Sequence, residues 1–352
     1  MKDPRPEKPE YSRRLLELLA EVPLVRLDKK PRGKRPSTGS VPDRSIDVLV
    51  GEDRWELILE MKSSGEPRLI RGAIHQLQSD TAASARVYGV VSAPYLGERA
   101  QELCKEARIG YLDLAGNCRL AFSSVFIERK GFPNTRVERR PLRTLFAPKA
   151  SRILRILVTA PKRTYRLQEL AKLAGVSLGL AFKVKERLLD LEYAREEKNG
   201  LRVNRPEDLL REWTRNYEFG KHTAVECYAM GEVAETERKL AAWCAEKRVP
   251  YAFTLFSGAA RVAPFARYLR SSAYVMTDPE KMAERLGWKV VPTGANVILL
   301  RPFDEGVLYG AQEVDGERVV SNVQLYLDLA SQRARGGEAA TFLLEQRLRP
   351  AW

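Results

Sequence analysis

The chain has 352 residues, of which 44% are hydrophobic and 30% are charged, and its formal net charge is +14. This composition fits a globular protein of two or three domains and excludes wholesale disorder, and no apolar run approaches the ~20 residues of a membrane-spanning helix. The first residues lack the apolar core of a signal peptide, and Cys104, Cys118, Cys227 and Cys244 form no Cys-x-x-Cys pair, so we expect a cytoplasmic protein without disulfides or structural zinc.

The positive charge is concentrated in one part of the chain. Residues 131–205 contain 18 Lys and Arg against seven Asp and Glu, a net charge of +11, whereas residues 1–43 have a net charge of +4. A local surplus of this kind indicates a surface that binds a polyanion. A solvated basic linker is the alternative interpretation.

The first part of the chain, residues 1–130, alternates patterns of helices and strands. In chain order we expect a helix over 11–20, a basic loop over 28–42, paired strands over 45–50 and 55–62, a helix over 68–83, a strand over 87–92, a helix over 97–107, and strands over 109–114 and 119–128. This alternation predicts a layered α/β domain. Residues 131–150 have no apolar periodicity and are predicted to be a basic linker.

Two acids and a lysine stand out in the paired strands. Glu60 and Lys62 are two residues apart and so face the same side of a strand, where Asp47 of the neighbouring strand can join them. The two carboxylates could hold Mg²⁺ while the lysine steadies an attacking water or the developing phosphate charge.

This Asp…Glu-x-Lys pattern and the order of elements over residues 10–130 resemble the PD-(D/E)XK nuclease superfamily, although Ile46 and not proline precedes Asp47. The resemblance implies a restriction-endonuclease-like fold, with Asp47 and Glu60 as metal ligands and Lys62 as a further catalytic residue. A domain of this fold that only binds DNA is the alternative, because such folds also survive without their activity.

Residues 151–205 follow the order of a winged helix-turn-helix. Helices are expected over 151–159 and 167–173, and after Gly175-Val176-Ser177 a third helix places Ala181, Val184, Leu188 and Leu191 on one face. Glycine permits the left-handed end of the second helix, and Ser177 can cap the third. Residues 193–203 predict a hairpin around Asn199-Gly200.

The stretch Leu170–Ser177 resembles the turn of many bacterial winged-helix regulators, whose third helix enters the major groove. We therefore expect double-stranded DNA as a partner. The residues expected near base edges are Ser177, Leu178, Leu180 and Lys183, and those expected at phosphates are Lys185, Arg187, Lys198 and Arg202. A winged helix used for protein contacts is the alternative.

Residues 206–352 predict a C-terminal α/β domain, with strands over 252–256, 273–276, 289–292 and 297–300 and a helix that begins after Ser321. This block is loosely similar to the nucleotidyltransferase fold, in which a Gly-Ser turn precedes a strand with two metal-binding aspartates. Here Ser257-Gly258 precedes strand 273–276, but that strand has no aspartate, and Asp278 cannot replace two. We expect a degenerate, non-catalytic domain that serves as a scaffold or binds a partner.

The whole chain resembles the AbiEi family of type IV toxin-antitoxin antitoxins. The resemblance rests on the winged helix and on five further runs, 109–117, 251–260, 294–297, 301–304 and 321–329. It implies a DNA-binding transcriptional regulator that represses its own promoter and opposes a cognate toxin protein. The alternatives are a Mg²⁺-dependent DNA endonuclease targeted by the winged helix and an antitoxin that binds only protein.

Overall fold

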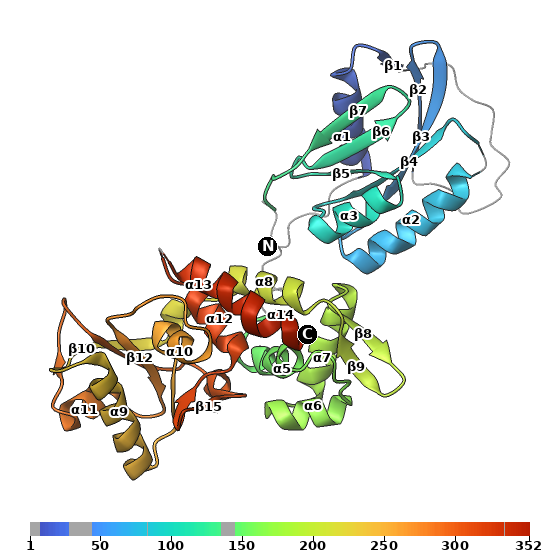
Figure 1. Ribbon diagram of the computed structural model, residues 1–352. Helices are drawn as coiled ribbons and strands as arrows, with labels where there is room; N and C mark the ends of the chain where they lie inside the picture. The colour runs from blue at the N-terminus through green and yellow to red at the C-terminus, as the bar shows by residue number, and fades with distance from the viewer. Residues whose placement is uncertain (1–7, 28–43, 83, 135–144, 334) are drawn as a thin grey trace. The chain divides into compact units, whose positions relative to one another are not determined.

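The computed structural model describes residues 8–27, 44–82, 84–134, 145–333 and 335–352. The chain divides into two compact units, the first with residues 1–138 and 190–192 and the second with residues 139–189 and 193–352 (Figure 1). Both units combine helices with a sheet, so the chain is of the mixed α/β class. Within the described residues, no helix is both long and apolar enough to cross a membrane.

The first unit is built on a seven-stranded sheet in the order β1-β2-β3-β4-β5-β6-β7. Strands β3, β4 and β5 run parallel, and the other neighbouring pairs are antiparallel. The strands are β1 Val25–Leu27, β2 Arg44–Val50, β3 Asp53–Met61, β4 Val87–Ala93, β5 Gly110–Asp113, β6 Cys118–Phe122 and β7 Val125–Arg129, and the helices are α1 Lys8–Ala20, α2 Pro67–Thr81 and α3 Glu98–Glu106.

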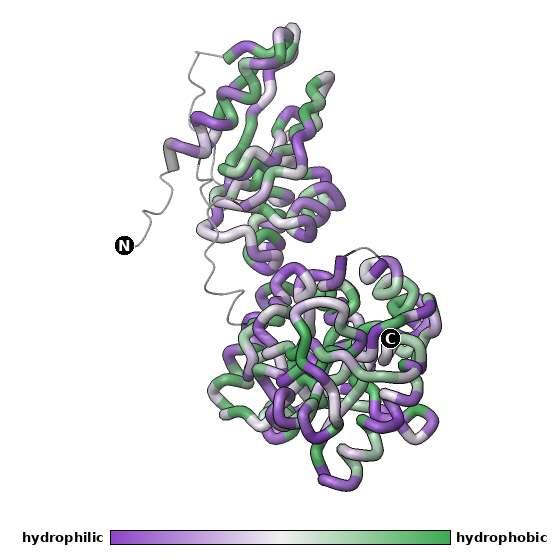
Figure 2. The backbone as a smooth tube through the Cα atoms, turned by 90° about the vertical axis from the view of Figure 1, so that its left-hand side faces the viewer, coloured by the Kyte–Doolittle hydropathy of each residue, from purple (hydrophilic) through white to green (hydrophobic). Residues whose placement is uncertain are grey.

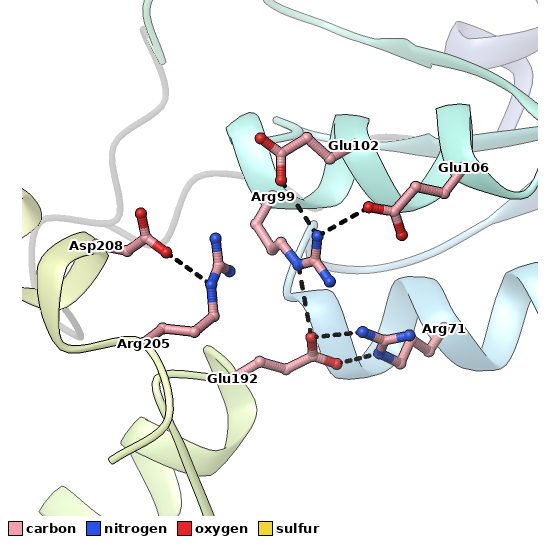
Figure 3. A network of polar contacts seen from close by, with 7 residues as sticks. All are labelled: Arg71, Arg99, Glu102, Glu106, Glu192, Arg205 and Asp208. Carbon is pink, nitrogen blue, oxygen red and sulfur yellow. Dashed lines mark hydrogen bonds and ion pairs between the residues drawn. The ribbon is translucent and has the colours of Figure 1, made fainter. Parts of the chain in front are cut away.

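Helices cover both faces of this sheet because successive side chains of β3 point to opposite sides. Leu57 and Leu59 pack in one buried cluster with Leu15 of α1, whereas Ile58 packs in another with Ile70 of α2. Hydrophobic and hydrophilic residues alternate along the helices of both units (Figure 2), as expected for helices with one buried face. On the exposed side of α3, Arg99 pairs with Glu102 and Glu106 (Figure 3).

Two features of this sheet differ from the sequence prediction. The single strand expected over 119–128 is the hairpin β6–β7, whose turn contains Ser123 with a φ of 49°. A serine in this left-handed conformation gives no sequence signal, unlike the glycine or asparagine common in such turns. Strand β1 was not predicted because it has only three residues.

The second unit begins with three helices and a hairpin, in the order that the sequence predicts. These elements are α5 Pro148–Thr159, α6 Leu167–Ala174, α7 Leu178–Asp190, β8 Ala194–Glu197 and β9 Gly200–Val203, and we call them the helix–hairpin segment. Helix α5 starts three residues inside the expected linker because Pro148 occupies its first turn, where a missing N–H costs nothing. Leu145, just before this helix, is already buried, and residues 135–144 of the expected linker lie outside the described residues.

The rest of the second unit surrounds a mixed seven-stranded sheet in the order β13-β10-β14-β12-β11-β16-β15. Its strands are β10 Thr223–Tyr228, β11 Tyr251–Phe253, β12 Ser271–Val275, β13 Lys289–Val290, β14 Val297–Arg301, β15 Gln312–Val314 and β16 Glu317–Val319. Its helices include α8 Pro206–Asn216, α9 Val233–Lys247, α10 Leu255–Val262, α11 Pro279–Arg285, α12 Asn322–Ala330, α13 Gly336–Leu343 and α14 Arg349–Ala351, with the 3-10 turns η1 Phe219–Lys221 and η2 Glu305–Leu308 and the π-helix η3 Leu344–Leu348. At the start of α8, Arg205 pairs with Asp208 at 2.7 Å (Figure 3).

The predicted strand over 252–256 is wrong in its second half. Strand β11 ends at Phe253 and helix α10 starts at Leu255, so Ser257 and Gly258 lie on a helix and not in a turn. A short apolar run is compatible with either structure, and its periodicity cannot decide between them. A Cβ atom at Gly258 would come within 3.0 Å of the Phe253 carbonyl oxygen and the Leu325 side chain, which explains the need for glycine here.

A buried arginine joins the helix–hairpin segment to the rest of the second unit. Arg155 of α5 is 2% exposed, and its guanidinium donates to the Gln324 side-chain oxygen of α12 at 2.6 and 3.1 Å and to the Ser151 hydroxyl at 2.8 Å. It also lies over the Trp213 ring of α8, 4.9 Å from the ring centroid. Every contact of this cation is therefore inside the protein, and α5 is held by α8 and α12.

The network continues to a buried carboxylate on α12. Asp328 accepts from the hydroxyls of Tyr217 (2.6 Å), Thr254 (2.5 Å) and Tyr274 (3.1 Å), and burial raises its pKa to about 6. The two tyrosine oxygens lie 3.0 and 3.1 Å from Nε2 of His222. Burial also lowers the pKa of His222 to about 4, which keeps the ring neutral.

Two more contacts fix α5. Arg152 binds Asp304 of the η2 turn through three hydrogen bonds of 2.8 to 3.1 Å. Burial opposes ionisation of Asp304, but these bonds keep the pKa of its carboxyl below the ordinary value. The Trp352 indole donates to the Val158 carbonyl oxygen at 2.9 Å. Helix α5 is thus a shared element of the whole second unit.

Candidate nucleic-acid interface

The turn between α6 and α7 has the geometry that the sequence predicts. Gly175 adopts the left-handed conformation with φ of 60°, and its N–H and that of Val176 close the end of α6 onto the Lys172 and Ala171 carbonyls. The Ser177 hydroxyl oxygen then accepts from the Leu180 N–H at 3.2 Å and caps α7. Three residues therefore connect the two helices with a fixed geometry.

Helix α7 has one buried and one exposed face. Ala181, Val184 and Leu188 are buried at the spacing that the sequence predicts. Outside this buried stripe, Leu178 is 48% exposed and Phe182 is 50% exposed. This exposed face is the one that a groove-binding helix would present.

The hairpin is held against the helices by a short bridge. Tyr165 exchanges two backbone hydrogen bonds of 2.9 Å with Leu201 of β9. Gly200 has a φ of +137°, and a Cβ atom at this position would lie 2.2 Å from the Tyr165 carbonyl oxygen. Glycine is therefore required where the hairpin crosses the segment before α6.

The predicted DNA-contacting residues differ in their availability. Leu178, Lys183 and Lys198 are exposed, as is Ser177, while Leu180 and Arg187 are half-buried. Lys185 forms an ion pair with Glu196, and Arg202 pairs with Glu197 at 3.3 Å. To bind DNA, each of these two cations would have to leave its carboxylate partner and pair with a phosphate.

Several cations of the helix–hairpin segment, which contains α7, are exposed. Four of them are exposed and form no ion pair within the described part of the chain, and they are Arg166, Lys172, Lys183 and Lys198. Arg166, Lys185 and Lys198 line a hollow of about 300 Å³ between the hairpin and α6. Arg166, Lys172 and Phe182 were not among the residues predicted from the sequence to contact DNA. The i, i+4 spacing of Phe182 from Leu178 is the signal that could have identified it.

The nuclease-like residues of the first unit are only partly brought together. Glu60 is buried at 5% exposure near the end of β3, and the Lys62 ammonium lies 2.6 Å from its carboxylate. Asp47 is paired in register with Glu56 and lies 3.4 Å from Arg54. The four residues from Glu56 to Glu60 span about 13 Å of strand, so Asp47 and Glu60 do not form a joint site for one metal ion.

Within the described residues, the pairing of β2 with β3 ends at Arg44 opposite Leu59, one residue before Glu60. In the sequence, Asp43 precedes Arg44 and follows Pro42; both lie outside the described residues. The Pro42-Asp43 dipeptide was not part of the site predicted from the sequence. Among the described residues, no three His, Cys, Asp or Glu side chains form a group that could hold a metal ion.

The run 109–117, one of those on which the family resemblance rests, contains a buried aspartate that has a structural role. Asp113 is 1% exposed and accepts from the backbone N–H groups of Leu96, Gly116 and Asn117 and from the Asn117 side chain at 2.8 to 3.1 Å. Burial raises the pKa of Asp113 although these bonds act in the opposite direction. The residue therefore organises the loop after β5.

The nucleotidyltransferase-like positions carry no pair of acids. Strand β12 is Ser-Ser-Ala-Tyr-Val, and all five residues are buried. Asp278 caps α11, because its side chain accepts from the N–H groups of Glu280 and Lys281 at 3.0 and 3.2 Å. Its carboxylate thus has a helix-capping role in the structure.

The C-terminal part of the chain is similar to transcriptional regulators of the antitoxin class. Residues 202–349 match the family model described as "Transcriptional regulator, AbiEi antitoxin, Type IV TA system". The runs 251–260, 294–297, 301–304 and 321–329 lie within the matched residues, whereas run 109–117 and most of the helix–hairpin segment lie outside them. No curated protein and no solved structure matches the chain.

Proposed function

We propose that the chain is a DNA-binding transcriptional regulator of the AbiEi antitoxin type, in which the helix–hairpin segment is a winged helix-turn-helix. The observation that carries this proposal is the exposed face of α7, in a segment whose cations Arg166, Lys172, Lys183 and Lys198 are exposed and unpaired among the described residues. Unpaired cations beside an exposed helix suit phosphates on either side of a major groove. The match of residues 202–349 to an antitoxin family supports the regulatory part of the proposal.

The first test is the salt dependence of binding to a random-sequence duplex. Each neutralised phosphate adds about −0.9 to the slope of log K against log salt. The double variant Lys183→Ala/Lys198→Ala should therefore flatten the slope by roughly 1.8. Lys281→Ala, an exposed lysine of α11, is the matched control and should leave it unchanged. Binding by the unaltered protein that does not depend on salt contradicts the proposal.

A cognate toxin protein is the second proposed partner, and we assign its recognition to residues 202–349. The absence of paired acids in β12 supports a binding role for this degenerate nucleotidyltransferase-like part and not a catalytic one. Co-expression with the product of a neighbouring gene tests this assignment. We expect the full chain to restore growth when that product is toxic, and we expect Lys183→Ala/Lys198→Ala to retain this effect while losing repression of a reporter under the upstream promoter.

A Mg²⁺-dependent endonuclease of the PD-(D/E)XK type is the second candidate function. The contact of Lys62 with the buried carboxylate of Glu60 favours it, as does the first unit's mixed sheet with helices on both faces. Mg²⁺ would supply Lewis-acid activation of a phosphate. Plasmid cleavage with Mg²⁺, Mn²⁺ or chelator tests the candidate, with Asp43→Ala, Asp47→Ala and Glu60→Gln compared side by side. If duplex, single-stranded and branched DNA all remain uncut under every condition, the endonuclease function is contradicted.

A further inference from the structure

An exposed apolar patch occupies the face of the proposed recognition helix. Leu178 and Phe182, four residues apart on α7, are each about half exposed. Single exposed apolar residues are ordinary, but a group on one face marks an interaction site. Ala181, Val184 and Leu188 already form the buried face of α7, so the exposed patch is not needed for folding.

The charges around the patch indicate what covers it. Lys183 follows Phe182 on α7, and it is exposed and unpaired among the described residues. Lys185 approaches the Phe182 ring, with its ammonium 5.9 Å from the ring centroid. An apolar protein surface would leave Lys183 without a partner. The major groove of DNA combines phosphates at its edges with one apolar group on its floor, the C5 methyl group of thymine.

The polar side chains of this face can form few hydrogen bonds with the edges of the bases. Over residues 177–183 the side chains that can form hydrogen bonds are those of Ser177 and Lys183, and the Ser177 oxygen already caps α7. No arginine, asparagine or glutamine is present in this run, and those side chains make the usual bidentate contacts with guanine and adenine. Apolar contact is therefore the main means of recognition that this face offers.

We propose that Phe182 and Leu178 read thymine methyl groups in the major groove, so that the protein selects duplexes with thymines at adjacent steps. This inference rests on the proposed DNA-binding function. Residues four apart on a helix are about 6 Å apart along its axis, which corresponds to about two base steps of 3.4 Å. The two side chains therefore reach methyl groups within two or three neighbouring base pairs.

The test replaces thymine by uracil, which removes only the methyl group. Duplexes that bind the full chain are selected from a random library, and each thymine of the tightest duplex is then replaced singly. Loss of one buried methyl group corresponds to about a four-fold weaker Kd, and we expect this at two or three adjacent positions. For Phe182→Ala the thymine and uracil duplexes should bind equally at one or two of these positions. Phe126→Ala, a more exposed phenylalanine of β7, is the control and should keep the four-fold ratio.

The outcomes separate this inference from the function on which it rests. Duplex binding with equal affinity for thymine and uracil at every position overturns the inference and leaves DNA binding intact. Failure of the unaltered chain to retain any duplex overturns both. A Phe182→Ala variant that melts like the unaltered chain, keeps the unaltered chain's affinity and thymine preference for every duplex and loses self-association identifies the patch as a protein interface and overturns the inference. A Phe182→Leu variant should retain part of the thymine preference, because it keeps an apolar side chain.

Discussion

Replacing Arg155 by methionine tests whether the buried network holds the second unit together. Methionine has a similar length but no donor, so the Gln324 oxygen loses both of its guanidinium contacts, at 2.6 and 3.1 Å. An orphaned buried acceptor costs about 1–3 kcal/mol, and the lost contact with the Trp213 ring adds up to about 2 kcal/mol. Asp328, the buried carboxylate in the same network, also loses a nearby positive charge.

Burial also disfavours the charged form of Arg155, because desolvation lowers its pKa. Removing the charge recovers part of that cost, so we expect a net loss of about 3 kcal/mol, at the lower end of the range for broken buried ion pairs. Urea unfolding monitored by tryptophan fluorescence measures it, since Trp213 contacts the arginine directly. Arg155→Lys should be intermediate. A methionine variant within 1 kcal/mol of the unaltered chain would refute the reasoning.

Three further predictions concern single residues. The folded-state pKa of Asp328 is about 6, above its ordinary 3.8, so its stabilising contribution is fully present below the ordinary pKa and is lost as the pH rises through about 6. The difference in stability between Asp328→Asn and the unaltered chain should therefore change by about 2 kcal/mol between pH 4 and pH 6, measured by urea titrations. Lys62→Ala leaves the buried Glu60 carboxylate without its 2.6 Å partner, and calorimetry should show a loss of about 3 kcal/mol in the first unit that Lys62→Ala/Glu60→Gln partly reverses. Gly200→Ala places a Cβ atom 2.2 Å from a carbonyl oxygen and should lower the free energy of unfolding by about 2–3 kcal/mol, measured by thermal unfolding. Gly51→Ala, with open space around it, is the control and should lower it by about 1 kcal/mol. Equal effects of the two variants would contradict the steric argument.

The sequence predicts elements best where one face of a regular element is buried. The spacing of Ala181, Val184 and Leu188 predicts α7, and Gly175 and Ser177 predict the turn before it, because each of these signals is local. The end of β11 and the start of α10 are not predicted, since the apolar residues around Phe253 fit a strand and a helix equally well.

The polar network around α5 could not be predicted from the sequence. Arg155 appears among the basic residues that indicate DNA binding, yet the fold buries it against residues more than 50 positions away. Charge counts assume an exposed side chain, so a buried arginine is counted as part of a surface. Similarly, Lys185 is predicted from the sequence to contact a phosphate, but in the fold it pairs with Glu196. Which cations are free depends on tertiary contacts, which a one-dimensional pattern does not contain.

Helix α5 has a thermodynamic consequence for the second unit. It packs against α6 and β9 on one side and against α12 and η2 on the other, and its Arg152 and Arg155 bind residues beyond position 300. A helix shared by two sets of elements makes their unfolding a single cooperative event. A ligand that binds the C-terminal sheet of the folded unit therefore also protects the hairpin from unfolding, by mass action. Amide exchange in β8 and β9 should slow when such a ligand binds, even though it touches neither strand.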